Sequence, residues 1–113
     1  MMEIQVEHRA PATVVRIIGN VDGLSAEKLL AEFQARVGEG HVRLVADLSG
    51  VNYTSSAGLR ALLAVLREAR RGGGDLRLAC VHAPVLKILE LSGFTSILKL
   101  YDDVDGAVAS FAE

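Results

Sequence analysis

Apolar and polar residues alternate in the first part of this chain and then recur at helical spacing further along. The stretches 4–8 and 13–18 are typical of strands. The short link at 9–12 favours an antiparallel hairpin, because parallel neighbours need a longer crossover. The second stretch is rich in valine and isoleucine, so we expect it inside the sheet.

The pattern then alternates between helices and buried strands. Apolar residues at helical spacing predict a helix over 25–37 with Ser25 as its N-cap. Apolar runs predict strands at 42–48, 76–81 and 97–101. Further helices are expected from Ser56 to the glycines at 72–74, from Pro84 to Ser92, and near the C-terminus after a cap at Asp102 or Asp103.

This order of elements predicts an α/β fold. Strands that alternate with helices are joined by crossovers and form a mainly parallel sheet. The opening hairpin adds an antiparallel neighbour, so we expect a mixed sheet with about four helices. A chain of 113 residues suits a single domain, which we place at 1–113.

The composition of the chain argues against several classes of protein. The net charge is −2 and aromatic residues make up 4%, which argues against nucleic-acid binding. No apolar run approaches the roughly 18 residues of a membrane span. The alternating start, Met1 to Glu7, does not resemble a signal peptide. The lone Cys80, expected to be a small buried residue within a strand, suits a reducing compartment. We therefore expect a cytoplasmic protein.

Candidate chemistry is concentrated where the strand at 42–48 gives way to a helix. The hydroxyl residues Thr54, Ser55 and Ser56 occupy that junction. A helix start leaves several N–H groups unpaired and carries a partial positive charge, so a hydroxyl cap or a phosphate is stabilised there. One hydroxyl acting only as a helix cap is the simplest interpretation.

Catalysis and metal binding are less well supported by the sequence. Ser56, Asp75 and His82 follow the order of a hydrolase triad, but Thr54 stands where a nucleophile elbow needs glycine. A small domain also leaves little chain to build a substrate pocket. The three histidines lie in separate segments without metal-ligand spacing. We expect no enzyme activity, no metal and no cofactor.

The glycines at 72–74 beside arginines invite comparison with a phosphate-binding loop. A P-loop, however, precedes its helix, whereas these glycines follow one. We interpret them as a helix end, with Arg67, Arg70 and Arg71 complementing the helix dipole.

Three motifs in register carry a resemblance to a known family. The segment Asp47-Leu-Ser-Gly-Val-Asn-Tyr-Thr-Ser-Ser-Ala-Gly-Leu-Arg-Ala-Leu-Leu resembles the signature of STAS domains, in particular stand-alone anti-sigma factor antagonists of bacteria. The turn 19–22 and the stretch 89–94 match two further motifs of that family. The resemblance covers nearly the whole chain.

The resemblance implies a switch controlled by phosphorylation. In the family, a serine at this helix start is phosphorylated by a kinase that is often itself the anti-sigma factor, and a metal-dependent phosphatase of the PP2C type resets it. The unphosphorylated form binds the anti-sigma factor. Ser56 matches the usual acceptor position, with Ser55 as the alternative because Ser55 stands where many members have aspartate. The predicted partner-binding residues are Asn20, Asp22, Thr54, Ser55, Ser56, Gly58 and Arg60.

Two other roles of a STAS domain are also compatible with the sequence. The same module could serve a partner switch in secretion or signalling, or a small subunit of a lipid-transport complex. Gly58 could permit close helix packing or close approach of a partner. Nucleotide binding is possible by resemblance, although no phosphate-cradling loop in the chain argues for it.

Overall fold

Five strands form one mixed sheet in the computed structural model, which describes residues 2–112. Met1 and Glu113, the ends of the predicted domain, lie outside the described residues. The strands lie side by side in chain order, and only the first pair is antiparallel. They are β1 (Glu3–Arg9), β2 (Ala12–Ile18), β3 (Arg43–Gly50), β4 (Asp75–Ala79) and β5 (Lys99–Tyr101).

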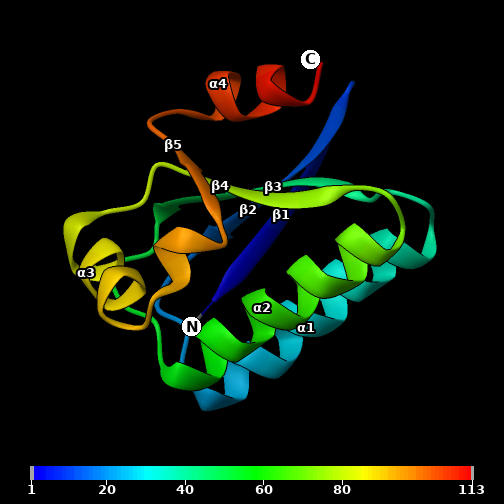
Figure 1. The fold of residues 1–113 in the computed structure, drawn as a ribbon. Coiled ribbons are helices and arrows are strands. Elements are labelled where there is room, and N and C mark those ends of the chain that lie inside the picture. Colours follow the sequence, from blue (N-terminus) through cyan, green and yellow to red (C-terminus); the bar gives the residue numbers. More distant parts are fainter. Residues whose placement is uncertain (1, 113) are drawn as a thin grey trace.

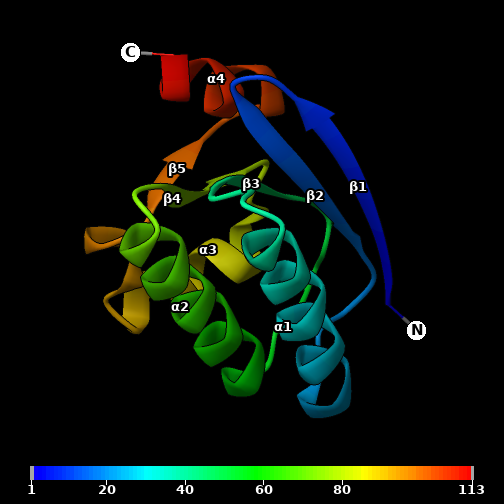
Figure 2. The ribbon, with the colours of Figure 1, turned by 90° about the vertical axis from the view of Figure 1, so that its right-hand side faces the viewer.

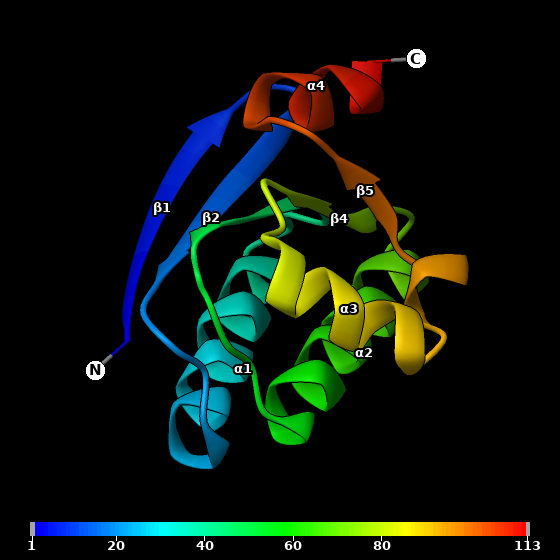
Figure 3. The ribbon, with the colours of Figure 1, turned by 90° about the vertical axis from the view of Figure 1, so that its left-hand side faces the viewer.

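Helices cover the two faces of the sheet unequally (Figure 1). Three helices pack on one face, namely α1 (Gly23–Gly38), α2 (Ser56–Arg71) and α3 (Ala83–Leu91). The other face carries only the short α4 (Val104–Ala109) and the turn η2 (Ser110–Ala112), while η1 (Phe94–Ser96) links α3 to β5. In Figure 2, α1 and α2 run side by side beneath the sheet, and Figure 3 shows α3 next to them. None of the helices among residues 2–112 combines the length and the apolar character needed to cross a membrane.

Strand alternation explains why the sheet has two cores. Residues such as Val15, Ile17 and Leu44 point to the three-helix face and are fully buried with Leu29 and Phe33 of α1. Residues one position away in sequence point to α4, where a smaller cluster forms. That second cluster comprises Ala12, Val14, Val45, Ala79, Ala107 and Val108.

The predicted fold class is confirmed, and the differences concern ends of elements. The antiparallel hairpin, the parallel remainder and four helices are all present. The strand predicted at 76–81 ends at Ala79, and the last strand begins at Lys99 rather than at residue 97. Asp103, one of two candidates, is the cap of α4: its Oδ1 accepts a hydrogen bond from the N–H of Gly106 at 2.6 Å.

The glycines after α2 end the helix, as predicted. Gly72 is its C-cap, and a Cβ on Gly74 would lie 1.9 Å from the carbonyl oxygen of Val42, so only glycine fits there. Arg70 lies in the last helical turn, where its guanidinium binds the Asp75 carboxylate at 3.0 Å. This contact joins the end of α2 to the start of β4.

Candidate functional site

Two loops at one end of the sheet are joined through their backbones. The loop after β2 and the loop after β3 form a parallel bridge between Val21 and Thr54. The N–H of Val21 donates to the carbonyl of Tyr53 at 3.0 Å, and the N–H of Ser55 donates to the carbonyl of Val21 at 2.7 Å. Because each loop leads into a helix, the bridge holds the N-terminal ends of α1 and α2 next to each other (Figure 2).

The two candidate serines have different environments. Ser55 is the N-cap of α2, and its Oγ accepts a hydrogen bond from the N–H of Gly58 at 3.2 Å. Ser56 is the first residue of the helix and its side chain is exposed. None of the side-chain hydrogen bonds between residues 2 and 112 involves the Ser56 hydroxyl. Capping therefore uses Ser55 and leaves Ser56 free.

Thr54 and Gly58 shape this turn from inside. Both residues are buried. A Cβ built on Gly58 would lie 2.2 Å from Oγ1 of Thr54 and 2.8 Å from Cγ1 of Val21. The absence of a side chain at Gly58 thus lets α2 start directly against the bridged loops.

Asp22 is the N-cap of α1, and this corrects the prediction that Ser25 caps the helix. The Oδ1 of Asp22 accepts a hydrogen bond from the N–H of Ser25 at 2.8 Å, and the Ser25 Oγ accepts one from the N–H of Asp22 at 2.8 Å. Ser25 is therefore the third residue of the helix and the second half of a capping box. The hydrogen bonds from the backbone and the hydroxyl of Ser25 lower the pKa of Asp22.

The remaining predicted residues and two unpredicted ones complete the surface around the bridge. Asn20 and Arg60 are exposed, as are Asp22 and Ser56. Leu24 and Tyr53, which are not among the predicted site residues, have exposed fractions of 80% and 50%. Leu24 falls outside the apolar stripe of its helix, which was the available signal that it faces solvent. We define the bridge surface as Asn20, Asp22, Leu24, Tyr53, Ser56 and Arg60.

The structure does not bring together the serine, acid and histidine of the catalytic alternative. Asp75 lies beyond the opposite end of α2, a helix of 16 residues and therefore about 24 Å long. Its buried carboxylate is bound by Arg70 and Arg77 at 3.0 and 3.1 Å. The Nε2 of His82 lies 2.6 Å from the carbonyl oxygen of Ser49. Asp75 and His82 are therefore both engaged with groups other than Ser56.

Cys80 also differs from its prediction. It follows β4 rather than lying within it, is only half-buried, and has a φ of 59°, in the left-handed region. Burial, followed by the negative charge of Asp47, raises the pKa of the Cys80 thiol. Within the part of the chain that the structure describes, no three histidine, cysteine or acidic side chains cluster as a metal site would require.

Known proteins share both the sequence and the fold of this chain. The model of the STAS domain family matches residues 3–107. A candidate anti-sigma factor antagonist of Bordetella bronchiseptica, BtrV, is 40% identical over 82% of this chain and 80% of its own length. An anti-sigma factor antagonist from Mycobacterium paratuberculosis is 25% identical, with a TM-score of 0.91 over 100% of this chain and 96% of its own.

A third relative has been solved in two states. The anti-sigma factor antagonist SpoIIAA in its unphosphorylated form has a TM-score of 0.84 at 19% identity, covering 97% of this chain and 96% of its own. Its phosphorylated form, from Bacillus, has a TM-score of 0.76 at 18% identity, covering 96% and 99%. The family match spans all five strands and the site at the start of α2. The relatives described above are named as anti-sigma factor antagonists, and the chain belongs to the STAS domain family.

Proposed function

We propose that this protein is an anti-sigma factor antagonist whose binding to an anti-sigma factor ends when Ser56 is phosphorylated. The observation that carries the proposal is the division of roles between the two serines. The Ser55 hydroxyl is engaged in capping α2, while the Ser56 hydroxyl is exposed on the bridge surface. A kinase can reach the exposed hydroxyl without unfolding the helix start.

A phosphate on Ser56 would be compatible with the fold. The first N–H groups of a helix lack intrahelical partners, and the helix dipole favours negative charge at this end. Phosphorylation adds about −1.5 to −2 charges. Because Thr54 and Gly58 are buried behind the turn, the modified side chain would extend into solvent and leave the packing intact.

The same phosphate would be unfavourable in a protein interface. Asp22 already contributes a carboxylate with a lowered pKa to this surface, so a phosphate would raise the local negative charge further. Burying an unpaired charge costs several kcal/mol. Shifting a complex from almost fully bound to almost fully free requires about 5.5 kcal/mol, so one phosphate at the centre of an interface is close to sufficient.

The partners follow from this switch. We infer an anti-sigma factor with serine kinase activity as the binding partner and a PP2C-type phosphatase that removes the phosphate, all acting in the cytoplasm. The exposed Leu24 and Tyr53 supply the apolar part of the interface, and Asn20, Asp22 and Arg60 supply its polar part. Catalysis is no part of this role, because the protein acts by binding.

The test combines phosphate mapping with binding measurements. Mass spectrometry of the protein from its native cells should locate phosphate on Ser56. The anti-sigma factor should bind wild type and Ser56→Ala, whereas Ser56→Asp should weaken binding at least about a hundredfold, equivalent to roughly 2.7 kcal/mol. Thr95→Asp is the matched control, since Thr95 is exposed in η1, away from the bridged loops.

Two results would change the assignment. Phosphate on Ser55, with loss of binding in Ser55→Asp, would transfer the switch to the capping residue. No phosphate under any growth condition, together with equal binding by Ser56→Asp and wild type, would refute a phosphorylation switch at this turn.

A further inference from the structure

Positive charge follows the exposed side of α2 along its length. Apart from Ser56, the exposed residues of this helix are all arginines, namely Arg60, Arg67, Arg70 and Arg71. A helix turns by about 100° per residue, so Arg60, Arg67 and Arg71 lie within about 60° of Ser56 around the helix axis. We call these three residues the arginine stripe. Ser56 stands at its N-terminal end.

Arg60 is the member of the stripe within reach of Ser56. Residues four apart on a helix have Cβ atoms about 5–6 Å apart, and each Cα–Cβ bond tilts toward the N-terminus of the helix. A long side chain at position 60 can therefore extend over the turn that contains Ser56. Arg67 begins about 17 Å further along the axis than Ser56 and cannot make the same contact.

Arg60 has no ion-pair partner within the part of the chain that the structure describes. None of the salt bridges formed there includes its guanidinium. The residues one turn away along α2 are serine, alanine and leucine, which carry no charge. At the start of α3, the Nε2 of His82 lies against the carbonyl oxygen of Ser49 at 2.6 Å. The guanidinium is therefore free to bind an anionic group on its own helix.

Acidic side chains in the first turns of α1, which packs beside α2, do not engage Arg60 either (Figure 2). The carboxylate of Asp22 accepts a hydrogen bond from the N–H of Ser25 at 2.8 Å. Glu27 is exposed and takes no part in the ion pairs of the described residues. On α2 itself, a phosphate at Ser56 would introduce the negative charge that the arginine stripe lacks.

We propose that Arg60 binds the phosphoryl group of phosphorylated Ser56 and is thereby engaged on its own helix. This role rests on the proposed function, which puts the phosphate on Ser56. A guanidinium donates two parallel hydrogen bonds to phosphate oxygens, and such charge-assisted bonds are about twice as strong as neutral ones. In the unphosphorylated protein the same guanidinium stays available to a partner.

Phosphorylation then changes the bridge surface at two positions. Ser56 gains a phosphate, and Arg60 turns from the partner to that phosphate. The phosphate carries about −1.5 to −2 charges and the guanidinium a single positive charge, so the surface still becomes more negative. The pair thus adds the loss of a positive contact to the effect of the phosphate charge on the interface.

The pairing can be measured on the full chain without its kinase. Phosphoserine is incorporated at position 56 during translation, and the phosphate signal is followed by phosphorus NMR across a pH titration. The second pKa of phosphoserine lies near about 6, and a bound guanidinium lowers that pKa because it favours the dianion. We expect the titration midpoint to lie about 0.3–0.7 pH units lower in the wild-type sequence than in Arg60→Gln.

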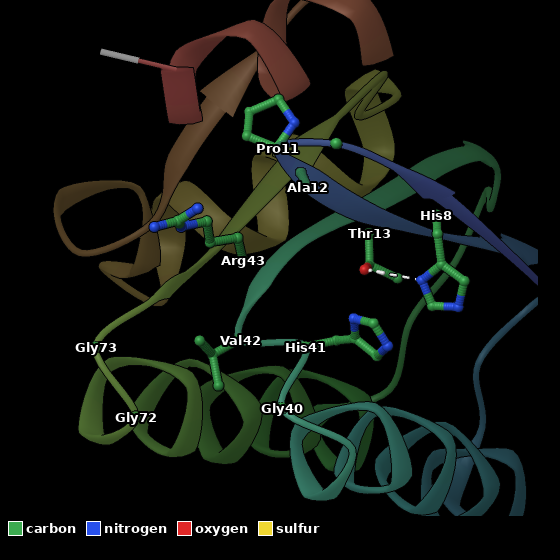
Figure 4. Close-up of a pocket in the computed structure, with 11 residues that line it drawn as sticks. His8, Pro11, Ala12, Thr13, Gly40, His41, Val42, Arg43, Gly72 and Gly73 are labelled. Atoms are coloured by element: carbon green, nitrogen blue, oxygen red, sulfur yellow. Dashed lines mark hydrogen bonds between the residues drawn. The ribbon is translucent and has the colours of Figure 1, made fainter.

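Two controls each remove another arginine and leave Arg60 in place. Arg67→Gln acts on the same face of α2, beyond reach of the phosphate. Arg43→Gln acts at the far end of α2, where the exposed Arg43 lines a cleft of about 500 Å³ (Figure 4). Neither control should move the midpoint by more than about 0.1 pH units, because salt screens charges at such distances. Arg60→Lys keeps the charge but not the planar fork, so it should restore part of the difference.

The possible results separate this pairing from the switch itself. Equal midpoints in wild type, Arg60→Gln and Arg67→Gln would overturn the pairing, whether or not the partner responds to phosphorylation. Absence of phosphate on Ser56 in native cells would refute the switch, while a lower midpoint with the incorporated phosphoserine would still establish that Arg60 binds the phosphate.

Discussion

The close packing around Gly58 predicts how a single substitution changes the stability of the fold. Its missing Cβ would lie 2.2 Å from Thr54 Oγ1 and 2.8 Å from Val21 Cγ1, both within the bridged loops. Gly58→Ala should therefore destabilise the fold by about 1–3 kcal/mol through overpacking. Urea unfolding monitored by circular dichroism measures this change.

The control for that substitution is a second helical glycine. A methyl group on Gly38, the last residue of α1, would have no neighbour within 4 Å, so Gly38→Ala should be neutral or stabilising by up to about 1 kcal/mol. Equal effects of Gly58→Ala and Gly38→Ala would contradict the tight packing described at the start of α2.

Asp22 makes stability depend on pH in a defined direction. Hydrogen bonds from Ser25 lower the pKa of Asp22 in the folded state, so the carboxylate stabilises the protein above its ordinary pKa of about 3.9. That stability is lost as pH falls through the lowered folded value. Asp22→Asn keeps a capping oxygen but cannot titrate.

The unfolding midpoints of wild type and Asp22→Asn should therefore converge as pH falls from 7 to 2, with wild type the more stable at neutral pH. Urea titrations at both ends of this range measure the midpoints. A difference that does not change with pH would show that the charge of Asp22 has no part in capping α1.

Among the four α-helices, α4 depends most on contacts with the rest of the protein for its stability. It has six residues, far fewer than the roughly 12–15 that an isolated helix needs. Contacts at both its ends hold it in place: Asp105 binds Arg9 at 2.6 Å, and the Ser110 Oγ accepts from Arg77 at 2.7 Å. The guanidinium of Arg77 also lies 4.0 Å from the centre of the Phe111 ring.

Hydrogen exchange should reflect this dependence. We expect amides of α4 to exchange well before those of α2, whose apolar face is buried in the main core. Phe111→Ala should speed exchange in α4 while leaving α2 nearly unchanged, because Phe111 packs against the smaller cluster on the opposite face of the sheet. Equal acceleration in both helices would mean that the two faces of the sheet unfold together.

The spacing of apolar residues predicted the helices and strands well, because these elements form where apolar side chains are buried in the core. The helix that starts at Ser56 and the β1–β2 hairpin could both be predicted, because in each of them the apolar residues recur at the spacing that directs them into the core. The wrong predictions concern features that depend on one side chain or on one backbone dihedral angle. Ser25 and Asp22 are both good caps, and the choice depends on where the bridged loop places the helix start. The left-handed φ of Cys80 could not be predicted, because the residue lies in an apolar stretch that looks like a continuous strand.

At the scale of the whole molecule, the two ends of α2 carry different chemistry. The N-terminal end presents the bridge surface with Asp22 and Ser56, and the C-terminal end lies at a cleft of about 500 Å³ whose lining includes His8 and His41. The motif around Ser56 was readable in the sequence because its residues are contiguous. The cleft was not readable in this way, because its two histidines are distant in sequence and only the fold brings their ring centroids to 4.3 Å from each other.

The bridge between Val21 and Thr54 has a consequence for how such proteins diversify. Main-chain atoms make its hydrogen bonds, so the two loops keep their relative position whatever the exposed side chains beside them are. Paralogues in one cell can therefore differ at a few solvent-facing positions and each recognise its own partner without crosstalk. The same property makes this scaffold suitable for building orthogonal signalling pairs by exchanging those side chains alone.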